Sequence, residues 1–575
     1  MSFRQVMSLF PLLTANIWAL PAQSSLVALN HTVHGRLHAA EPFARACYSD
    51  YDGQPVKSFP TQCSALQEQY TSAAYRAEFY SGFMYDQDHI CASSQDPLTA
   101  QCLLDPTNPI SHLSSNDSCG QGSVSTHYIE VSSATDVQAA FAFARDHGIT
   151  LSIKNSGHDY GSRNSLRGSL ALWTRRLQKM EYHRDFLPEG CPSNFTSRYN
   201  AMKVGAGVSF NQAYHFADEN NSTFVGGSSP TVGASGGFVM TGGHGLLTSQ
   251  FGLGIDRVLE FKIVTPDGVF RTANACQNQD LYWALRGGGG GTFGVVMEST
   301  SKVEPVLPLV FSSINLPSNM TNTTTFTRIL MENAIRWSKE GWGGPNGPNF
   351  MAMVNPFLSL EEAKESMAPI LEYTASQGGN IILETHPTFL SVYEKYVYTT
   401  NELGIGFGSL PTNRLIPTEL LKTQLGQTQI LTYLNRVISK GFTPTIFATT
   451  PAYYSYIPGS TSATPAWRNS TWMVTTQTQW LWNSTVAEKK AIVSSLKEIT
   501  RDFEALAPVS GSYISEADPW THDWQYAWWG ENYPQLAQLK KKYDPKGLLS
   551  CWRCVGWDEK LQARGQAFEC MGSLN

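Results

Sequence analysis

The stretch from residue 128 to residue 162 constrains the fold of this chain more than any other feature. Residues 128–131 predict a strand, and Ser133 opens a pattern that resembles a helix capping box. Over residues 133–148 apolar side chains then recur at the i, i+3, i+4, i+7 spacing of a helix, and a glycine stands at the end. Residues 149–153 predict a second strand, so the stretch predicts a β-α-β unit.

A turn of small residues follows the second strand directly. Residues 154–162 read Lys-Asn-Ser-Gly-His-Asp-Tyr-Gly-Ser. Small residues leave backbone N–H groups free to converge on an anion, and a pyrophosphate fits such a turn. His158 is unusual in it, because an imidazole is not needed to bind phosphate. A second glycine-rich stretch, from 226 to 245, indicates backbone lying against a flat or phosphorylated ligand, and a plain set of turns is the alternative.

Several common enzyme motifs are excluded. Residues 289–294 match G-x-G-x-x-G, but a helical pattern over 279–285 precedes them and a strand pattern over 295–297 follows. A dinucleotide-binding fingerprint requires the opposite order. The chain contains no G-x-x-x-x-G-K-[ST] and no H-E-x-x-H, so the sequence supports neither a phosphate-binding P-loop nor a zinc protease.

Composition limits the class of protein further. A chain of 575 residues is too long for one small module, and 42% hydrophobic with 15% charged residues exclude disorder. The net charge of −6 offers no basic surface for nucleic acid. Between residues 305 and 510, helical and strand patterns alternate and predict a sheet covered by helices. The helical patterns cover 361–374, 418–437 and 486–503, and the strand patterns cover 349–354, 380–384 and 471–482.

The N-terminus predicts a secreted protein. Arg4 precedes an apolar stretch over residues 6–20, and Ala19 and Ala22 offer cleavage sites, as in a signal peptide. No later run reaches the roughly 18 apolar residues of a membrane helix, so we expect no membrane anchor. Nine N-glycosylation sequons support the secretory pathway. They lie at Asn30, Asn116, Asn194, Asn220, Asn221, Asn319, Asn322, Asn469 and Asn483.

Ten cysteines fit the same oxidising compartment, and we expect them to form structural disulfides. Cys551 and Cys554 form a C-x-x-C, for which redox exchange or zinc is the alternative. His31, His34 and His38 have loose metal-like spacing, but a solvated tail after the cleavage site explains them better. We expect no metal site.

Four motifs in order resemble one family. They are Ser156-Gly157-His158-Asp159, Pro230-Thr231-Val232-Gly233, residues 252–256 (Gly-Leu-Gly-Ile-Asp), and residues 280–290, which end in four glycines. Together with the tail at 532–536 and 542–545, they resemble the flavoproteins related to vanillyl-alcohol oxidase and berberine bridge enzyme, with an FAD-binding domain of the PCMH type. The resemblance spans about 120–556, and fungal secreted FAD-linked oxidoreductases are the most similar class.

The resemblance implies an α+β fold. We expect a two-part FAD-binding domain of the PCMH type and an α+β substrate domain whose antiparallel sheet is covered by helices. The implied boundaries are a signal peptide over 1–22, a cysteine-rich, irregular extension over 23–121, the FAD-binding domain over 122–305, the substrate domain over 306–510, and a berberine-bridge-like segment over 511–575 that returns to the FAD domain.

The resemblance also implies FAD as the cofactor, attached covalently through one histidine. His158 matches the histidine that bonds the flavin 8α-methyl carbon, with simple hydrogen bonding as the alternative. The other residues expected to bind FAD are Asn155, Ser156, Gly157, Asp159, Gly161, Ser162, Gly227, Ser228, Ser229, Thr231, Val232, Gly233, Gly236, Gly237, Gly242, Gly243, Gly245, Asp256, Ile263, Asn532 and Tyr533.

Three positions within the motifs are specific to this chain. Bicovalent members carry a cysteine before Pro-Thr-Val-Gly, whereas this chain has Ser229, so we expect a single covalent link and a less oxidising flavin. Val232 occupies the position that helps decide oxygen access, and its small side chain resembles that of oxidases; plain packing is the alternative. Phe238 stands where many relatives carry histidine, which removes one expected hydrogen bond to the flavin ribityl chain.

The implied reaction is oxidation of a small organic substrate (an alcohol, a phenol or a secondary metabolite) by hydride transfer to the flavin. Molecular oxygen then reoxidises the reduced flavin. An oxidative cyclase in a biosynthetic pathway and a non-catalytic secreted binding glycoprotein are the alternatives. We expect a monomer.

The catalytic base is not identified by the resemblance. The leading candidates are Glu384 and His386, which share one face of a predicted strand, and Tyr454 and Tyr456, which share one face of another. Tyr398, Tyr453 and His244 are further candidates, and ordinary structural roles are the alternative for each. Trp520, Trp524, Trp528 and Trp529 either line the pocket or belong to the core.

Overall fold

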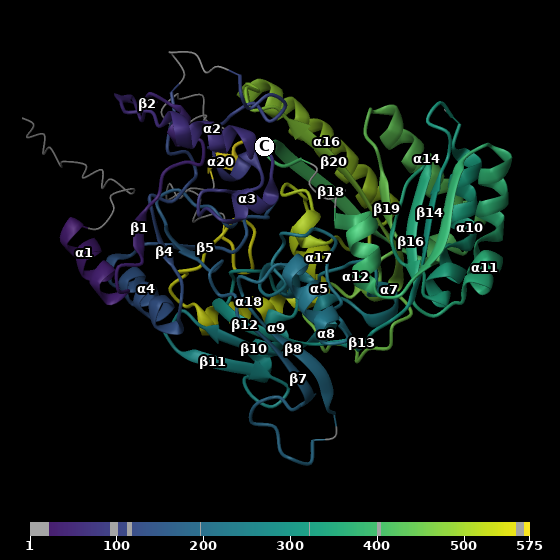
Figure 1. Cartoon of the computed structure of the whole chain (residues 1–575), viewed down its shortest axis with the longest axis horizontal. Helices are drawn as coiled ribbons and strands as arrows, with labels where there is room; N and C mark the ends of the chain where they lie inside the picture. Colours follow the sequence, from purple (N-terminus) through teal and green to yellow (C-terminus); the bar gives the residue numbers. More distant parts are fainter. Residues whose placement is uncertain are drawn as a thin grey trace, which may run out of the picture.

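A computed structural model describes residues 22–91, 102–111, 118–195, 197–320, 322–398, 404–558 and 569–574. The fold is α+β, as expected, and contains three large sheets (Figure 1). Residues 1–21 of the signal peptide predicted over 1–22, and the sequon at Asn116, lie outside the described residues.

The predicted β-α-β unit is confirmed. Strands β4 (His127–Glu130) and β5 (Leu151–Lys154) both pair in parallel with β6 (Leu170–Trp173), which lies between them. Helix α4 (Ala134–His147) begins at the predicted capping box of Ser133 and ends at Gly148, whose φ of 66° is left-handed. The turn with His158 therefore starts at the carboxyl end of β5, an edge strand of this sheet.

A second, antiparallel sheet completes the glycine-rich half of the molecule. Its order is β11-β10-β12-β8-β7, and its strands are β7 (Met180–Phe186), β8 (Tyr199–Gly205), β10 (Val258–Val264), β11 (Phe270–Asn274) and β12 (Val295–Lys302). Two helices of the C-terminal segment pack on it together with α9 (Gln279–Leu285). They are α17 (Trp524–Trp529) and α18 (Tyr533–Tyr543), and their core contacts include Phe261, Leu285, Trp529 and Leu536. The segment over 289–294 does lie between a helix and a strand, in the order that excludes a dinucleotide fingerprint.

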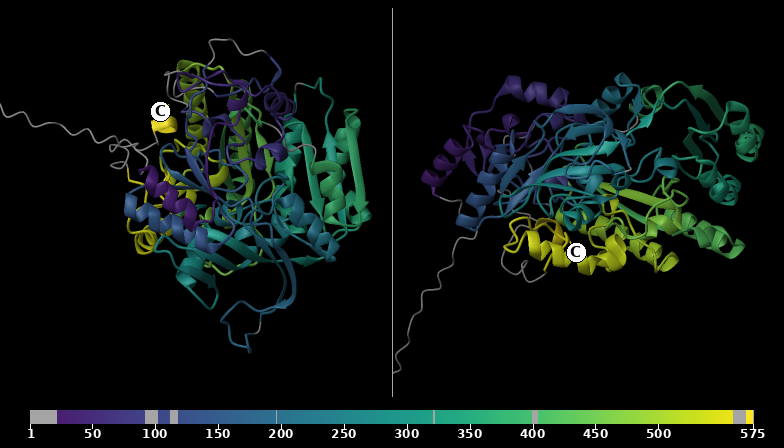
Figure 2. Two further views of the ribbon diagram at one scale, coloured as in Figure 1. Left: turned by 60° about the vertical axis from the view of Figure 1, so that its left-hand side comes forward. Right: turned by 90° about the horizontal axis from the view of Figure 1, so that it is seen from below.

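The third sheet has seven antiparallel strands, in the order β17-β14-β16-β15-β19-β20-β18. Their bounds are β14 (Leu309–Asn315), β15 (Pro345–Asn346), β16 (Phe350–Asn355), β17 (Asn380–His386), β18 (Gly408–Pro417), β19 (Thr445–Phe447) and β20 (Ser470–Trp480). Four helices cover one face: α10 (Thr324–Glu340), α11 (Leu360–Ser376), α14 (Gln424–Ser439) and α16 (Val486–Leu506). This is the predicted antiparallel sheet covered by helices, and α10 and α11 lie at its outer side (Figures 1 and 2).

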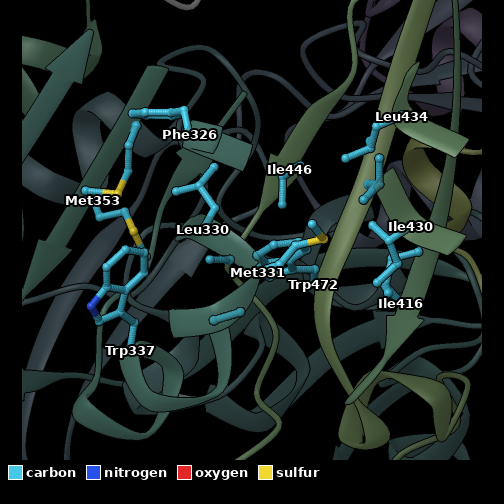
Figure 3. Packing of buried hydrophobic residues seen from close by; sticks show 14 of the residues in the cluster. Phe326, Leu330, Met331, Trp337, Met353, Ile416, Ile430, Leu434, Ile446 and Trp472 are labelled. Atoms are coloured by element: carbon cyan, nitrogen blue, oxygen red, sulfur yellow. The ribbon is translucent and has the colours of Figure 1, made fainter. Parts of the chain in front are cut away.

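Side-chain alternation separates the two faces of this sheet. Ile446 and Trp472 point into the core against α10 and α14 (Figure 3), and Val474 belongs to the same buried cluster. The intervening residues of the same strands face the glycine-rich half, where Leu415 and Met473 contact Leu253 and Ile255. That inner face is the one available to a site between the two halves.

Three expectations need correction. The helix predicted over 418–437 is two helices, α13 (Thr418–Leu421) and α14, because Thr423 caps the second with its side chain. Tyr454 and Tyr456 lie on a loop between Pro451 and Pro458, not on a strand. The N-terminal extension is not irregular, since it holds α1 (Gln23–Thr32), α2 (Pro60–Glu68) and α3 (Ala73–Ala77).

The extension is also attached to the rest of the molecule. Its strand β1 (Leu37–Ala39) pairs with β4, and α1 packs on α4 through Leu26 and Leu29. His31, His34 and His38 therefore lie on or beside these elements and not in a tail, and no metal-binding group occurs within the described ranges. In the part of the chain that the structure covers, no helix is long and apolar enough to cross a membrane.

All ten cysteines are bridged, as predicted. The pairs are Cys47–Cys63, Cys91–Cys570, Cys102–Cys119, Cys191–Cys276 and Cys551–Cys554. The C-x-x-C is thus a disulfide, and Cys91–Cys570 fastens the extension to the C-terminal end of the chain.

A buried ion pair joins the two halves and gives a stability prediction. Arg468 of α15 (Ala466–Asn469) binds Asp256 of α8 (Gly254–Arg257) through two bonds of 2.6 and 2.9 Å, and both side chains are 6% exposed. Arg468→Ala leaves the Asp256 charge buried without its partner, so we expect unfolding in urea to require about 3–5 kcal/mol less free energy. Lys364→Ala, which breaks the exposed pair with Glu361, is the control and should change stability by less than about 1 kcal/mol. Equal effects of the two variants would contradict the prediction.

Candidate active site

His158 is held by the second glycine-rich segment. Its Nε2 lies 2.7 Å from the hydroxyl oxygen of Thr231, which is buried. Burial, and after it the nearby Lys154 cation, lowers the pKa of His158 to about 3, so the imidazole is neutral near pH 7. The two motifs that the sequence singled out are therefore in direct contact.

The turn around His158 is rigid. The Asp159 carboxylate accepts hydrogen bonds from the backbone N–H groups of Gly161 and Arg163, and pairs with the Arg163 guanidinium at 2.5 Å. Ser162 adopts a left-handed φ of 54°. Asp159, for which the sequence predicts FAD binding, shapes the turn that presents His158.

The N-terminal extension supports this turn from behind. Met84 N–H donates to the Gly157 carbonyl at 3.2 Å, and the ring of Tyr85 stacks on Tyr160 at 4.3 Å and meets His158 edge-on at 6.2 Å. Gln87 donates to the carbonyls of Tyr160 and of Ser409 in β18. A Cβ at Gly157 would lie 3.0 Å from the Gly82 carbonyl oxygen, so only glycine allows this close contact.

A space free of side chains lies beside the turn. A Cβ built at Gly237 would have no heavy atom within 4 Å, and at Gly291 the nearest would be Ile153 at 3.7 Å. Gly290 lies between them, since its Cβ would be 3.1 Å from the Gly237 Cα. Two strips of glycine backbone thus face each other, as expected for a cradle that holds an extended, phosphorylated ligand.

Polar atoms next to this cradle lack protein partners. Asn155 donates through Nδ2 to the carbonyls of Ala206 and Ser235, but its Oδ1 is buried and unpaired. The hydroxyl oxygens of Ser229 and Ser235 are likewise buried and unpaired. Since such groups normally bind a ligand or a water, the donor set fits FAD.

The other residues expected to bind FAD fall into two groups. Ser156, Gly161 and Ser162 lie on the His158 turn, and Gly227, Ser228, Val232, Gly233 and Gly236 lie on the Thr231 segment, with Gly242, Gly243 and Gly245 following helix α6 (Gly237–Thr241). The second group has partners elsewhere. Asp256 pairs with Arg468, Ile263 is buried within β10, Asn532 donates to the carbonyls of Ser462 and Ala463, and the Tyr533 hydroxyl accepts from Gly556 N–H.

Phe238 has an unexpected position. Its ring packs edge-on against Phe210 at 4.7 Å and lies close to the backbone of Gly227 and Gly243. It therefore stabilises the glycine turns from within. The four candidate tryptophans, Trp520, Trp524, Trp528 and Trp529, also pack in the core, and the Trp529 indole donates to the Gly287 carbonyl at 2.9 Å.

His244 occupies the junction between the two halves. Its Nδ1 lies 2.9 Å from the Thr449 hydroxyl and its Nε2 3.3 Å from a Glu516 carboxylate oxygen. The rings of Phe447 and Tyr513 flank it edge-on, each at 5.2 Å, and His244 itself is only 9% exposed. A histidine between a hydroxyl and a carboxylate is a typical arrangement for accepting a proton.

Glu516 is positioned by the inner face of the seven-stranded sheet. The segment before it runs along β18, where the Asn413 side chain binds both the N–H and the carbonyl of Tyr513, at 2.8 and 3.0 Å. Burial raises the pKa of Tyr160 to about 12 and the Glu516 charge adds to this rise. Glu516 is therefore within electrostatic reach of the His158 turn as well as bonded to His244.

The leading candidates for the base lie apart from this cluster. Glu384 and His386 do share a face of β17, 2.7 Å apart, but this is an edge strand and Lys395 and Tyr396 also bind the carboxylate. These bonds lower the pKa of Glu384 to about 2. Tyr454 lies beside Gly252, and Tyr456 is covered by Arg468 at 4.3 Å. Tyr398 and Tyr453 are exposed.

Sequence reasoning missed several residues of the site, among them Thr449, Glu516 and Tyr85. Glu516 lies between the substrate domain and the recognised tail motif, and Tyr85 lies in the extension, outside every motif. The only sequence signal that could have pointed to Glu516 or Tyr85 is the position of Glu516 close to the tail motif.

Comparison with known proteins agrees with this arrangement. A family described as FAD binding domain matches residues 125–274, and one described as berberine and berberine like matches residues 512–550. FAD-linked oxidoreductase OXR2 of Pyricularia oryzae is 42% identical over 564 residues, which cover 96% of this chain and 95% of the relative.

Two solved structures share the fold. The VAO-type flavoprotein MtVAO615 from Myceliophthora thermophila has a TM-score of 0.79 at 24% identity, covering 94% of this chain and 96% of that one. Glucooligosaccharide oxidase from Acremonium strictum, described with a 6-S-cysteinyl, 8α-N1-histidyl FAD, has a TM-score of 0.61 at 20% identity and covers 75% of this chain and 92% of its own.

Proposed function

Because the chain belongs to the FAD-linked oxidoreductases of the vanillyl-alcohol oxidase and berberine bridge enzyme-like family, we propose that it is an oxidase of a small, uncharged organic molecule, with FAD attached through His158. The contact of His158 with Thr231 beside the open glycine cradle is the observation that carries this proposal. Membership in an enzyme family sets aside the alternative of a non-catalytic binding glycoprotein.

The proposed attachment is single. The imidazole of His158 is neutral, which an attacking nitrogen requires, and the rigid turn fixes its direction. Ser229 stands where bicovalent members have cysteine, and its hydroxyl cannot form a thioether. The two glycine strips would hold the pyrophosphate and the ribityl chain against backbone N–H groups.

The residues of the site divide the chemistry between them. When bound, FAD supplies the hydride acceptor at its N5 atom. Nε2–H of His244 donates to the Glu516 carboxylate, which leaves the Nδ1 lone pair, next to the Thr449 hydroxyl, to take the proton that the substrate releases, and Glu516 stabilises the resulting imidazolium. Thr449 fixes the ring through Nδ1. The aromatic rings of Phe447 and Tyr513 limit access of water to this pair.

The inner face of the sheet indicates the kind of substrate. Thr445, Thr475 and Gln477 point to this side, are at least partly exposed and carry no charge. Neutral amide and hydroxyl groups recognise neutral polar groups of a ligand, since a charged substrate would require a partner charge. We therefore propose an uncharged alcohol, phenol or secondary metabolite.

Oxygen as the electron acceptor is a further part of the proposal. Val232 follows Thr231 directly and is only partly buried, so a small side chain lines the approach next to His158. A bulkier side chain there would narrow the space beside the cofactor.

Flavin bleaching under nitrogen with a library of neutral alcohols and phenols tests the function. We expect at least one member to bleach the flavin and air to restore the colour within seconds. Val232→Leu should slow reoxidation by about tenfold or more with little effect on bleaching, because one added methylene narrows the space. Sluggish reoxidation of the wild-type enzyme would contradict the oxidase assignment, and V232L reoxidising at the wild-type rate would contradict the role of Val232.

Secretion with N-glycosylation completes the proposal. Five disulfides require an oxidising compartment. Six sequon asparagines are exposed: Asn194, Asn221, Asn319, Asn322, Asn469 and Asn483.

A further inference from the structure

We propose that Thr231 is the positioning residue for flavin attachment: its hydroxyl binds Nε2 of His158 and leaves Nδ1 as the atom that forms the bond. This inference rests on the proposed covalent link at His158. The prediction that Thr231 binds FAD does not by itself explain why its hydroxyl contacts His158, and the proposed role does.

The geometry fixes which nitrogen is free. The bond of 2.7 Å from Nε2 to Thr231 Oγ1 is the one side-chain hydrogen bond of His158 within the described residues. Nδ1 has no protein partner there. Tyr85 meets the imidazole edge-on at 6.2 Å, and Thr231 is only 7% exposed, so the hydroxyl that binds Nε2 is buried.

The chemistry requires that arrangement. In the attachment, the Nδ1 lone pair forms a bond to the flavin 8α carbon while one C–H bond of that methyl group breaks. The Nε2–H proton leaves as well. Two electrons and two protons are thus removed, and dioxygen takes them and becomes hydrogen peroxide. Nδ1 has a lone pair only if the proton of the neutral imidazole is on Nε2.

A hydroxyl can bind Nε2 of His158 both before and after the flavin is attached. Before attachment the Thr231 oxygen accepts the hydrogen bond from Nε2–H, and it thereby favours the reactive tautomer. Afterwards Nε2 carries no proton, so the hydroxyl turns and donates to it. Only a group that both accepts and donates can keep the bond throughout, and serine shares this property with threonine whereas valine, of the same shape, does not.

Two variants test the role. Thr231→Val and Thr231→Ser are purified without added FAD and then incubated with FAD in air, and samples are precipitated with acid over time. Flavin fluorescence in the washed pellet, and the mass of the intact chain, measure attachment without any substrate. We expect T231S to attach FAD within about twofold of the wild-type rate, and T231V to bind FAD yet attach it at least about tenfold more slowly, the equivalent of one lost hydrogen bond.

Other outcomes overturn the proposal. Attachment by T231V at the wild-type rate excludes a role for the hydroxyl, and a loss in T231S as large as that in T231V shows that the hydroxyl alone does not account for attachment. If T231V does not fold, Thr231→Ala removes the hydroxyl without adding a methyl group at its place, and the same criteria apply to it.

Failure of the underlying link has a different signature. If the wild-type pellet holds no flavin although the native protein is yellow, both the covalent link at His158 and the role of Thr231 are contradicted. If the wild type and T231V attach FAD at the same rate, only the role of Thr231 is contradicted.

Discussion

His158→Ala is expected to give a protein that still binds FAD but releases all of it on acid precipitation. The cradle between Gly237 and Gly291 does not involve the imidazole, so non-covalent binding survives. The bond itself has no substitute, because Ser229 cannot form a thioether. Loss of the electron-withdrawing nitrogen should also make the flavin less oxidising, and substrate should reduce it at least about tenfold more slowly, a change of roughly 1.4 kcal/mol in the barrier.

The matched control is Ser229→Ala, which removes the other side chain that stands at an attachment position of bicovalent relatives. Its buried hydroxyl has no protein partner, so we expect the pellet to keep its flavin and the protein its fold. Native absorbance, pellet fluorescence and the reduction potential of each variant are the measurements. Flavin retained in the H158A pellet, or lost from that of S229A, would place the link elsewhere.

Local signals made the centre of the fold predictable. The capping box at Ser133 and the left-handed Gly148 act within one helix turn, so α4 begins and ends where the sequence predicts. The helix predicted over 418–437 failed at Thr423, because its cap competes with an apolar pattern that runs through it. The prolines on either side of Tyr454 and Tyr456 likewise overrode the alternation that predicted a strand.

The site was predictable only where it lies within one motif. His158 and Thr231 belong to recognised segments, whereas Tyr85 reaches the turn because the extension pairs with β4 and is fastened by Cys91–Cys570. No periodicity encodes that contact. Glu516 arrives at His244 through the bonds of Tyr513 to Asn413, which are long-range and involve an ordinary amide. Such tertiary contacts decide the choice among base candidates.

Glu516→Gln is expected to slow reduction of the flavin by substrate by about 10²–10⁴-fold, the range for loss of an effective general base. Glutamine keeps the shape and the hydrogen bond to His244, but it has no charge with which to stabilise the imidazolium. His244→Gln should show a loss of similar size, and the double variant should be little worse than either, because the two residues act as one unit.

Rapid mixing under nitrogen measures that step apart from the reaction with oxygen. The control is Glu384→Gln, a change of the same kind at the edge strand β17, where the carboxylate is paired with Lys395 and lies apart from His244. We expect E384Q to reduce its flavin at the wild-type rate, and E516Q to keep its flavin in the acid pellet and to reoxidise in air normally after chemical reduction. A wild-type rate in E516Q, or an equal loss in E384Q, would move the base away from the His244–Glu516 pair. E384Q and E516Q each remove one negative charge from the partner of a histidine. Only His244, the partner of Glu516, lies between the two halves of the molecule, so a difference between the two variants reports on that position.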